Sequence, residues 1–155
     1  MRASDAYNLE SPVQLPVADH FMTSTPRPAR ILIVDDQPDI RKLLHLALDM
    51  RENTEIREAV DGEDGCAKAL DWLPDLILLD VMMPGMDGLA VCRRIRQHPL
   101  MKDHTKVVML SGRCQPKEVE QGIQAGCDAY LPKTFSPLKL LQRVNEMLGG
   151  ETAPE

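Results

Sequence analysis

The stretch from residue 75 to residue 88 constrains the fold more than any other part of this sequence. Ile77, Leu78 and Leu79 form a short, wholly apolar run that stops at the carboxylate of Asp80. A Pro-Gly pair and then an Asp-Gly pair follow, which are typical of a turn and of a helix start. An apolar run of this length, bounded by turn signals, predicts a strand buried on both faces. Such a strand carries Asp80 to its carboxyl end, where open parallel sheets bind their ligands.

The same strand pattern recurs along the chain and alternates with helical patterns. Strands are predicted at 30–34, 54–60, 76–80, 106–110 and 128–131. The second of these is weaker, with Ile56 and Val60 as its apolar anchors. Helices are predicted at 38–48, 61–73, 87–98, 116–125 and 136–148. Five strands alternating with five helices on short connections predict an α/β fold with a doubly wound parallel sheet.

Local signals support these helices. In the first, apolar side chains recur at helical spacing, at Ile40, Leu43, Leu44, Ala47 and Leu48. Asp61 and Asp87 are expected N-caps of the second and third helices. Gly126 is expected to end the fourth helix in the left-handed conformation.

A single domain of residues 30–148 accounts for all the predicted elements, and a chain of 155 residues is long enough to bury a substantial core. Residues 1–29 contain several prolines and no sustained periodicity, so we expect a flexible tail there. Met22 is a candidate for an alternative start of translation. Residues 149–155 are expected to form a second, short tail.

Composition excludes some classes of function. The formal net charge of −6 argues against direct binding of nucleic acid. No apolar run approaches the ~20 residues of a membrane span, and the N-terminus lacks the apolar core of a secretory signal. We therefore expect a cytoplasmic protein without a membrane partner. The four cysteines show no C-x-x-C spacing, and three of them fall in apolar helical patterns, which favours small core residues over metal ligands.

Polar residues follow four of the predicted strands at the same offset. They are Asp35 and Asp36, Asp80, Ser111, and Lys133. Because parallel strands present their carboxyl ends at one edge of the sheet, we expect these side chains to form one site. Each residue has an ordinary alternative role: a helix cap, a turn residue, a loop hydroxyl or a solvated charge. Their joint occurrence in this order favours the site.

Three clustered carboxylates repel one another, and a hard divalent cation would relieve that repulsion. An all-oxygen set without His or Cys favours Mg²⁺ or Mn²⁺ over zinc. A carboxylate beside such an ion can act as a nucleophile toward phosphorus and form an aspartyl phosphate. Lys133 and the ion would neutralise the transferring group, and Ser111 could donate a hydrogen bond to it.

The sequence resembles the receiver domain of two-component response regulators over residues 30–148. The resemblance rests on the segments at 31–36, 78–88, 110–112 and 128–133. It implies a flavodoxin-like (βα)5 sheet with strand order 2-1-3-4-5. It also implies that Asp80 is the phosphoacceptor, that Asp36 and Asp80 bind Mg²⁺ directly, and that Asp35 acts through water. The backbone carbonyl of Met82 would complete the protein ligands, while Ser111 and Lys133 would hold the phosphoryl oxygens.

The resemblance also implies a switch. Tyr130 matches the aromatic residue that turns inward as the hydroxyl at Ser111 moves onto the phosphate. That motion remodels the face made by the fourth helix, fifth strand and fifth helix. Met82 and Arg113 occupy the two positions that tune the lifetime of the phosphoryl group.

One departure from the family pattern concerns the residue after Lys133. Family members have proline there, joined by a cis peptide bond, whereas this chain has Thr134. A cis bond before a non-proline residue costs ~2.5–4 kcal/mol. Either that bond is cis and strained, or the loop is trans and Lys133 approaches the site differently.

The leading hypothesis is a stand-alone signalling switch, not an enzyme beyond assisting its own phosphorylation and dephosphorylation. Its expected partners are a sensor histidine kinase or a histidine phosphotransfer protein, and a downstream protein target, with a phosphorylation-dependent dimer as a further option. One alternative is an aspartyl-phosphate phosphatase, although such enzymes carry a second Asp where this chain has Met82. Others are a degenerate receiver that acts as a constitutive interaction module, and the receiver fragment of a longer regulator with an output domain.

Overall fold

The computed structural model describes residues 27–149, so most of the two expected tails (1–29 and 149–155) lies outside the described residues. The strands are β1 (Ala29–Val34), β2 (Thr54–Ala59), β3 (Leu76–Asp80), β4 (Lys106–Ser111) and β5 (Ala129–Pro132). The helices are α2 (Pro38–Leu48), α3 (Gly62–Trp72), α4 (Gly88–Gln97), α5 (Pro116–Ala125) and α6 (Pro137–Leu148). The strand β1 thus begins inside the stretch that was expected to be a tail. Within residues 27–149 no helix has the length and apolar character that a bilayer span requires.

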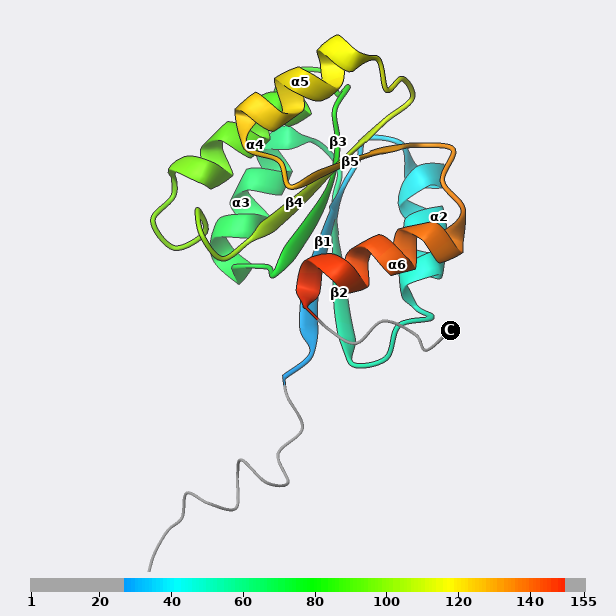
Figure 1. Cartoon of the computed structure of the whole chain (residues 1–155). Helices are drawn as coiled ribbons and strands as arrows, with labels where there is room; N and C mark the ends of the chain where they lie inside the picture. The colour runs from blue at the N-terminus through cyan, green and yellow to red at the C-terminus, as the bar shows by residue number, and fades with distance from the viewer. Residues whose placement is uncertain (1–26, 150–155) are drawn as a thin grey trace, which may run out of the picture.

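The strands form one parallel sheet in the order β2-β1-β3-β4-β5, which confirms the doubly wound topology and the order that the resemblance implied. Helices α2 and α6 cover one face, and α3, α4 and α5 cover the other (Figure 1). The register pairs Val34 with Leu79, Asp80 with Leu110, and Ser111 with Pro132. The carboxyl ends of four strands therefore meet at one edge of the sheet.

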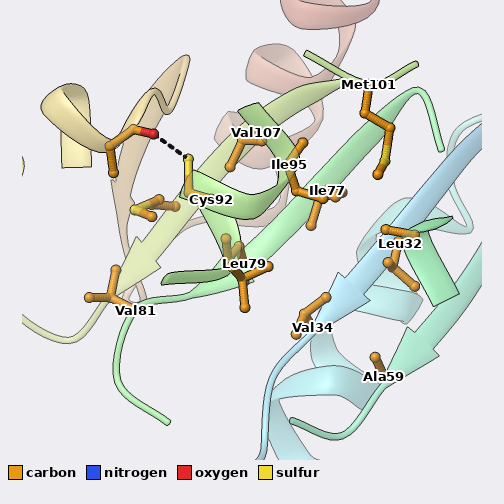
Figure 2. Packing of buried hydrophobic residues seen from close by; sticks show 14 of the residues in the cluster. Leu32, Val34, Ala59, Ile77, Leu79, Val81, Cys92, Ile95, Met101 and Val107 are labelled. Carbon is orange, nitrogen blue, oxygen red and sulfur yellow. Dashed lines mark hydrogen bonds between the residues drawn. The ribbon is translucent and has the colours of Figure 1, made fainter. Parts of the chain in front are cut away.

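The core consists of two apolar layers separated by the sheet. Successive strand residues alternate between them, because side chains in a strand point to opposite faces. Leu32, Ile77 and Val107 pack under α3 and α4, as Figure 2 shows, together with Cys92 and Ile95 of α4. Their strand neighbours pack against α2 and α6 in the second layer. Every residue of β3 is buried, as expected for a central strand with helices on both sides.

Helix ends follow the expected local chemistry. The side chain of Asp61 accepts a hydrogen bond from the backbone N–H of Asp64 (2.8 Å), and Asp87 accepts one from Ala90 (2.9 Å). Gly126 ends α5 with a φ of +107°, the left-handed conformation that glycine adopts without a steric penalty.

Two apolar residues do not lie where the pattern placed them. Val60 lies beyond the end of β2 and is 49% exposed, because β2 is an edge strand and its last paired residue is Ala59. Leu43 is 55% exposed, because only Leu44, Ala47 and Leu48 of α2 are turned fully into the core. The cysteines are mixed: Cys92 is buried, Cys66 and Cys127 are half-buried against the same layer, and Cys114 is exposed.

Candidate functional site

Three carboxylates converge where β1 and β3 end side by side. Asp35 and Asp36 follow β1 directly, and Asp80 is the last residue of β3. One oxygen from each lies within 4.8 Å of the others. Asp35 and Asp80 are 1% and 2% exposed, whereas Asp36 is half-buried at the surface. The start of α4 lies close against the end of β3, because a side chain on Gly88 would collide with the carbonyl oxygen of Asp80.

A cation and a hydroxyl come from the two strands on the other side of β3. Ser111 ends β4 and is buried. Lys133 follows β5, and its backbone N–H donates to the carbonyl oxygen of Ser111 (2.7 Å). The Lys133 Nζ lies 3.2 Å from Asp35 Oδ2 and 3.2 Å from Asp80 Oδ1. The five residues that the sequence placed at the carboxyl ends of these strands therefore lie together at one edge of the sheet.

The peptide bond between Lys133 and Thr134, for which the sequence left cis and trans open, is trans. None of the peptide bonds among residues 27–149 is cis, and these include the bond between Lys133 and Thr134. The ammonium of Lys133 nevertheless reaches both buried carboxylates.

The ammonium of Lys133 has a third neighbour that the sequence reasoning missed. It donates a hydrogen bond to Oε1 of Gln37 (3.1 Å), at the start of α2. The only signal in the sequence was position, because Gln37 directly follows the Asp35–Asp36 pair at the carboxyl end of β1. A glutamine in that place has an ordinary alternative as a helix-cap residue, so its side-chain contact required the structure.

Burial and mutual repulsion define the electrostatics of the site. Burial, together with the charge of Asp35, raises the pKa of Asp80 to about 6, although Lys133 and the Met82 N–H oppose this change. Burial lowers the pKa of Lys133, but the two carboxylates outweigh it and raise that pKa overall. Asp35 Oδ2 and Asp80 Oδ2 are buried and have no hydrogen-bond partner among the described residues. Buried carboxylate oxygens that accept no hydrogen bond are costly even beside the Lys133 ammonium, and they fit the oxygen donor set of a hard divalent cation.

The site opens into a cavity of about 530 Å³. Asp80, Ser111 and Lys133 line it from the sheet, and Arg113 and Tyr130 line it from the side of α5. Met82 also lines this cavity and is 68% exposed. A phosphoryl group would therefore have access to Asp80 from solvent.

A second cluster of polar side chains lies between β4, α5 and β5. The backbone N–H of Arg113 donates to Ser111 Oγ (3.0 Å), and its guanidinium forms an ion pair with Glu118 of α5 (3.0 Å). Glu118 Oε1 and the hydroxyl of Tyr130 are both buried without a hydrogen-bond partner among residues 27–149. Sequence reasoning singled out Arg113 and Tyr130 but missed Glu118, because a Glu in the first turn of a helix is favourable there without any further role.

The ring of Tyr130 lies close against α5 at Gly122. A Cβ at position 122 would lie 2.9 Å from two ring carbons of Tyr130 and 3.3 Å from the sulfur of Cys127. Gly122 therefore allows the ring to approach the helix backbone closely.

Comparison with known proteins points to one family. A family model described as the response regulator receiver domain matches residues 31–145. The chain is 45% identical over 119 residues to the transcriptional regulatory protein ResD of Bacillus subtilis, covering 77% of this chain and 48% of ResD. It is 41% identical over 119 residues to the DNA-binding dual master transcriptional regulator RpaA of Synechocystis, with the same two coverages, 77% and 48%. The chain thus spans about half the length of the curated relatives it matches. The solved structure of the chemotaxis protein CheY4 of Vibrio cholerae matches with a TM-score of 0.73 at 30% identity, covering 78% of this chain and 99% of CheY4.

Proposed function

Because this chain belongs to the response regulator receiver domain family, we propose that it is a phosphorylation-dependent switch in which Asp80 accepts the phosphoryl group. Receiver domains are signalling domains of two-component systems and not classical enzymes. The observation that carries the assignment to Asp80 is its position: it is buried at the end of the central strand, beside Lys133, and faces an open cavity.

The donor set supports Mg²⁺ or Mn²⁺ as the cofactor. Receiver domains generally bind Mg²⁺ at an acidic pocket, and the three clustered aspartates form such a pocket here. In our proposal Asp36, Asp80 and the carbonyl of Met82 bind the ion directly, and Asp35 binds it through water. The bound ion would neutralise charge on the phosphoryl group.

The proposed reaction is transfer of a phosphoryl group to a carboxylate oxygen of Asp80. A P–N bond in a phosphohistidine breaks, a P–O bond to Asp80 forms, and the histidine ring keeps the electron pair and takes up a proton. Lys133 remains protonated and, with Ser111, holds the phosphoryl oxygens. The donor would be a sensor histidine kinase or a histidine phosphotransfer protein, and a cytoplasmic location follows from such a donor.

The signal would be read on the α5–β5–α6 face. In our proposal Ser111 moves onto the phosphoryl group and Tyr130 responds, which shifts a pre-existing equilibrium between two conformations. Arg113 and Met82, at the mouth of the cavity, would set how long the phosphoryl group persists. The readers would be downstream proteins or a second copy of this chain, without direct contact to nucleic acid. Because ResD is a transcriptional regulatory protein about twice as long as this match, an output domain in a longer chain is the alternative.

A second candidate is a constitutive interaction module that takes no phosphoryl group. Thr134 in place of proline is the observation that favours it. The contacts of Lys133 with Asp35 and Asp80 count against it, because the ammonium occupies the site despite the trans bond.

Incubation with acetyl phosphate and Mg²⁺, followed by intact-mass measurement, tests the proposal. We expect a phosphate adduct on the wild type, none on Asp80→Asn, and an adduct on the matched control Asp103→Asn, because Asp103 is an exposed aspartate outside the site. A wild type that stays unmodified with both acetyl phosphate and a histidine kinase would leave only the interaction module.

A further inference from the structure

The ammonium of Lys133 makes contacts of two kinds. Its neighbours Asp35 and Asp80 are ion-pair partners at 3.2 Å, while the hydrogen bond goes to the amide oxygen of Gln37 at 3.1 Å. An ion pair is only weakly directional, whereas a hydrogen bond weakens steeply when its angle departs from linearity. Gln37, an exposed residue, therefore adds a directional contact to the two ion pairs that hold the ammonium.

The orientation of the Gln37 amide follows from chemistry. An ammonium has three N–H donors and no acceptor, so the group of Gln37 that faces Lys133 must be the oxygen and not the NH₂ group. With Gln37, Asp35 and Asp80 as neighbours, each of the three N–H groups of Lys133 has one oxygen to approach.

The backbone of Gln37 is itself held on both sides. Its N–H donates to Asp35 Oδ1 (2.8 Å), and its carbonyl oxygen accepts from the N–H of Arg41 in the first turn of α2 (3.1 Å). The amide oxygen thus projects from a fixed point. Lys133, in contrast, is a long side chain on a loop without proline after it, and such a side chain has many rotamers to choose from.

We propose that Gln37 is a positioning residue that orients the Lys133 ammonium toward Asp80 and thereby speeds phosphoryl transfer; this inference rests on the proposed function. Gln37 is a neutral acceptor, and hydrogen bonds to charged oxygens are about twice as strong. When phosphoryl oxygens arrive beside Asp80, Lys133 gives up the contact with Gln37 more readily than its contacts with the two carboxylates. Gln37 thus holds the ammonium in place before transfer and does not compete with the phosphoryl group.

Two measurements on the full chain test this role. The first is the nitrogen NMR signal of the Lys133 ammonium in the metal-free protein, assigned by its absence in Lys133→Met. We expect Gln37→Leu to lose or strongly broaden this signal. Gln37→Glu, which keeps an acceptor oxygen at the same distance along the side chain, should retain it. The matched control is Gln124→Leu, because Gln124 is an exposed glutamine of α5 outside the cavity, and it should leave the signal unchanged.

The second measurement is the rate of adduct formation with acetyl phosphate at saturating Mg²⁺. We expect Gln37→Leu to slow this rate roughly two- to tenfold, the effect of losing one ordinary hydrogen bond. Gln124→Leu should react at the wild-type rate. A Gln37→Leu variant with the wild-type rate overturns the inference, whether or not its ammonium signal changes. A wild type that forms no adduct refutes the proposed function instead, and the NMR comparison then still tests the contact between Gln37 and Lys133.

Discussion

Replacing Asp80 by Asn should stabilise the metal-free protein, although it removes the proposed phosphoacceptor. The pKa of Asp80 is raised from 3.8 to about 6, because the carboxyl is buried and lies beside Asp35, and Lys133 only partly offsets this. The ionised carboxylate is therefore less stable in the folded protein than in the unfolded chain. One pKa unit corresponds to about 1.4 kcal/mol, so the shift corresponds to about 3 kcal/mol at neutral pH. Asparagine has nearly the same shape, and its oxygen can still accept from the Met82 N–H.

The pH dependence gives the sign of the effect. Between about pH 4 and pH 6 the folded protein binds more protons at Asp80 than the unfolded chain does, so this residue lowers stability as the pH rises through that window. The loss is complete about one pH unit above this pKa, near pH 7. We therefore expect the difference between Asp80→Asn and wild type to be small near pH 4 and to reach up to about 3 kcal/mol at pH 7.

Urea unfolding in the presence of a chelator measures this difference. Trp72 is the only tryptophan and is 5% exposed, so its fluorescence should report the transition. Asp75→Asn is the matched control. Burial raises the pKa of Asp75, but its partners Arg27, Arg30 and His104 outweigh burial and lower that pKa overall, so the same substitution should destabilise the protein there. An Asp80→Asn variant no more stable than wild type at pH 7, or a gain that does not change with pH, would refute the reasoning.

Three further predictions concern the metal and the residues around the switch. Mg²⁺ at a hundredfold above the wild-type dissociation constant should stabilise the wild type by about 2.7 kcal/mol in urea unfolding. An equal gain in Asp36→Asn at the same Mg²⁺ concentration would contradict the assignment of Asp36 as a ligand. Gly122→Ala should destabilise the protein by about 1–3 kcal/mol, because a Cβ would lie 2.9 Å from the ring of Tyr130; an unchanged urea midpoint would mean that the ring moves aside freely. Burial, with Glu118 nearby, raises the pKa of Tyr130, so Glu118→Gln should lower that pKa. Phenolate absorbance in a Tyr7→Phe background, where Tyr130 is the only tyrosine left, tests this expectation, and a rise would count against it.

Most of the fold was predictable, because helices cover both faces of the sheet and the central strands must therefore be apolar throughout. Such continuous apolar runs can be recognised in the sequence. The short apolar run Ile77, Leu78, Leu79, bounded by turn signals, predicted a buried strand, and β3 is that strand. The apolar pattern of the sequence was less informative for the edge strand β2. Val60 extended the apolar pattern of β2, but an edge strand can end early and leave such a residue exposed.

The candidate site was predictable to the extent that it depends on topology. Asp35, Asp36, Asp80, Ser111 and Lys133 were placed together by one rule, that parallel strands end at a common edge. Gln37 and Glu118 were not predicted as site residues, because no rule of topology identifies them. Whether a long side chain reaches a neighbour from another element depends on its rotamer and on the loop opposite, and a sequence specifies neither directly.

The strand order also divides the site by how easily its parts open. β3 lies between β1 and β4 with every residue buried, whereas β5 has β4 as its single neighbour and consists of half-buried and exposed residues. Amide hydrogens of β3 should exchange with solvent only when the whole domain unfolds, while those of β5 should exchange through local fraying. Asp80 therefore ends a central, fully buried strand, whereas Tyr130 lies in an edge strand and Lys133 directly follows it. A phosphoryl group on Asp80 would therefore be bound at a central, buried strand, and the residues that respond to it would lie at an edge strand that opens more easily.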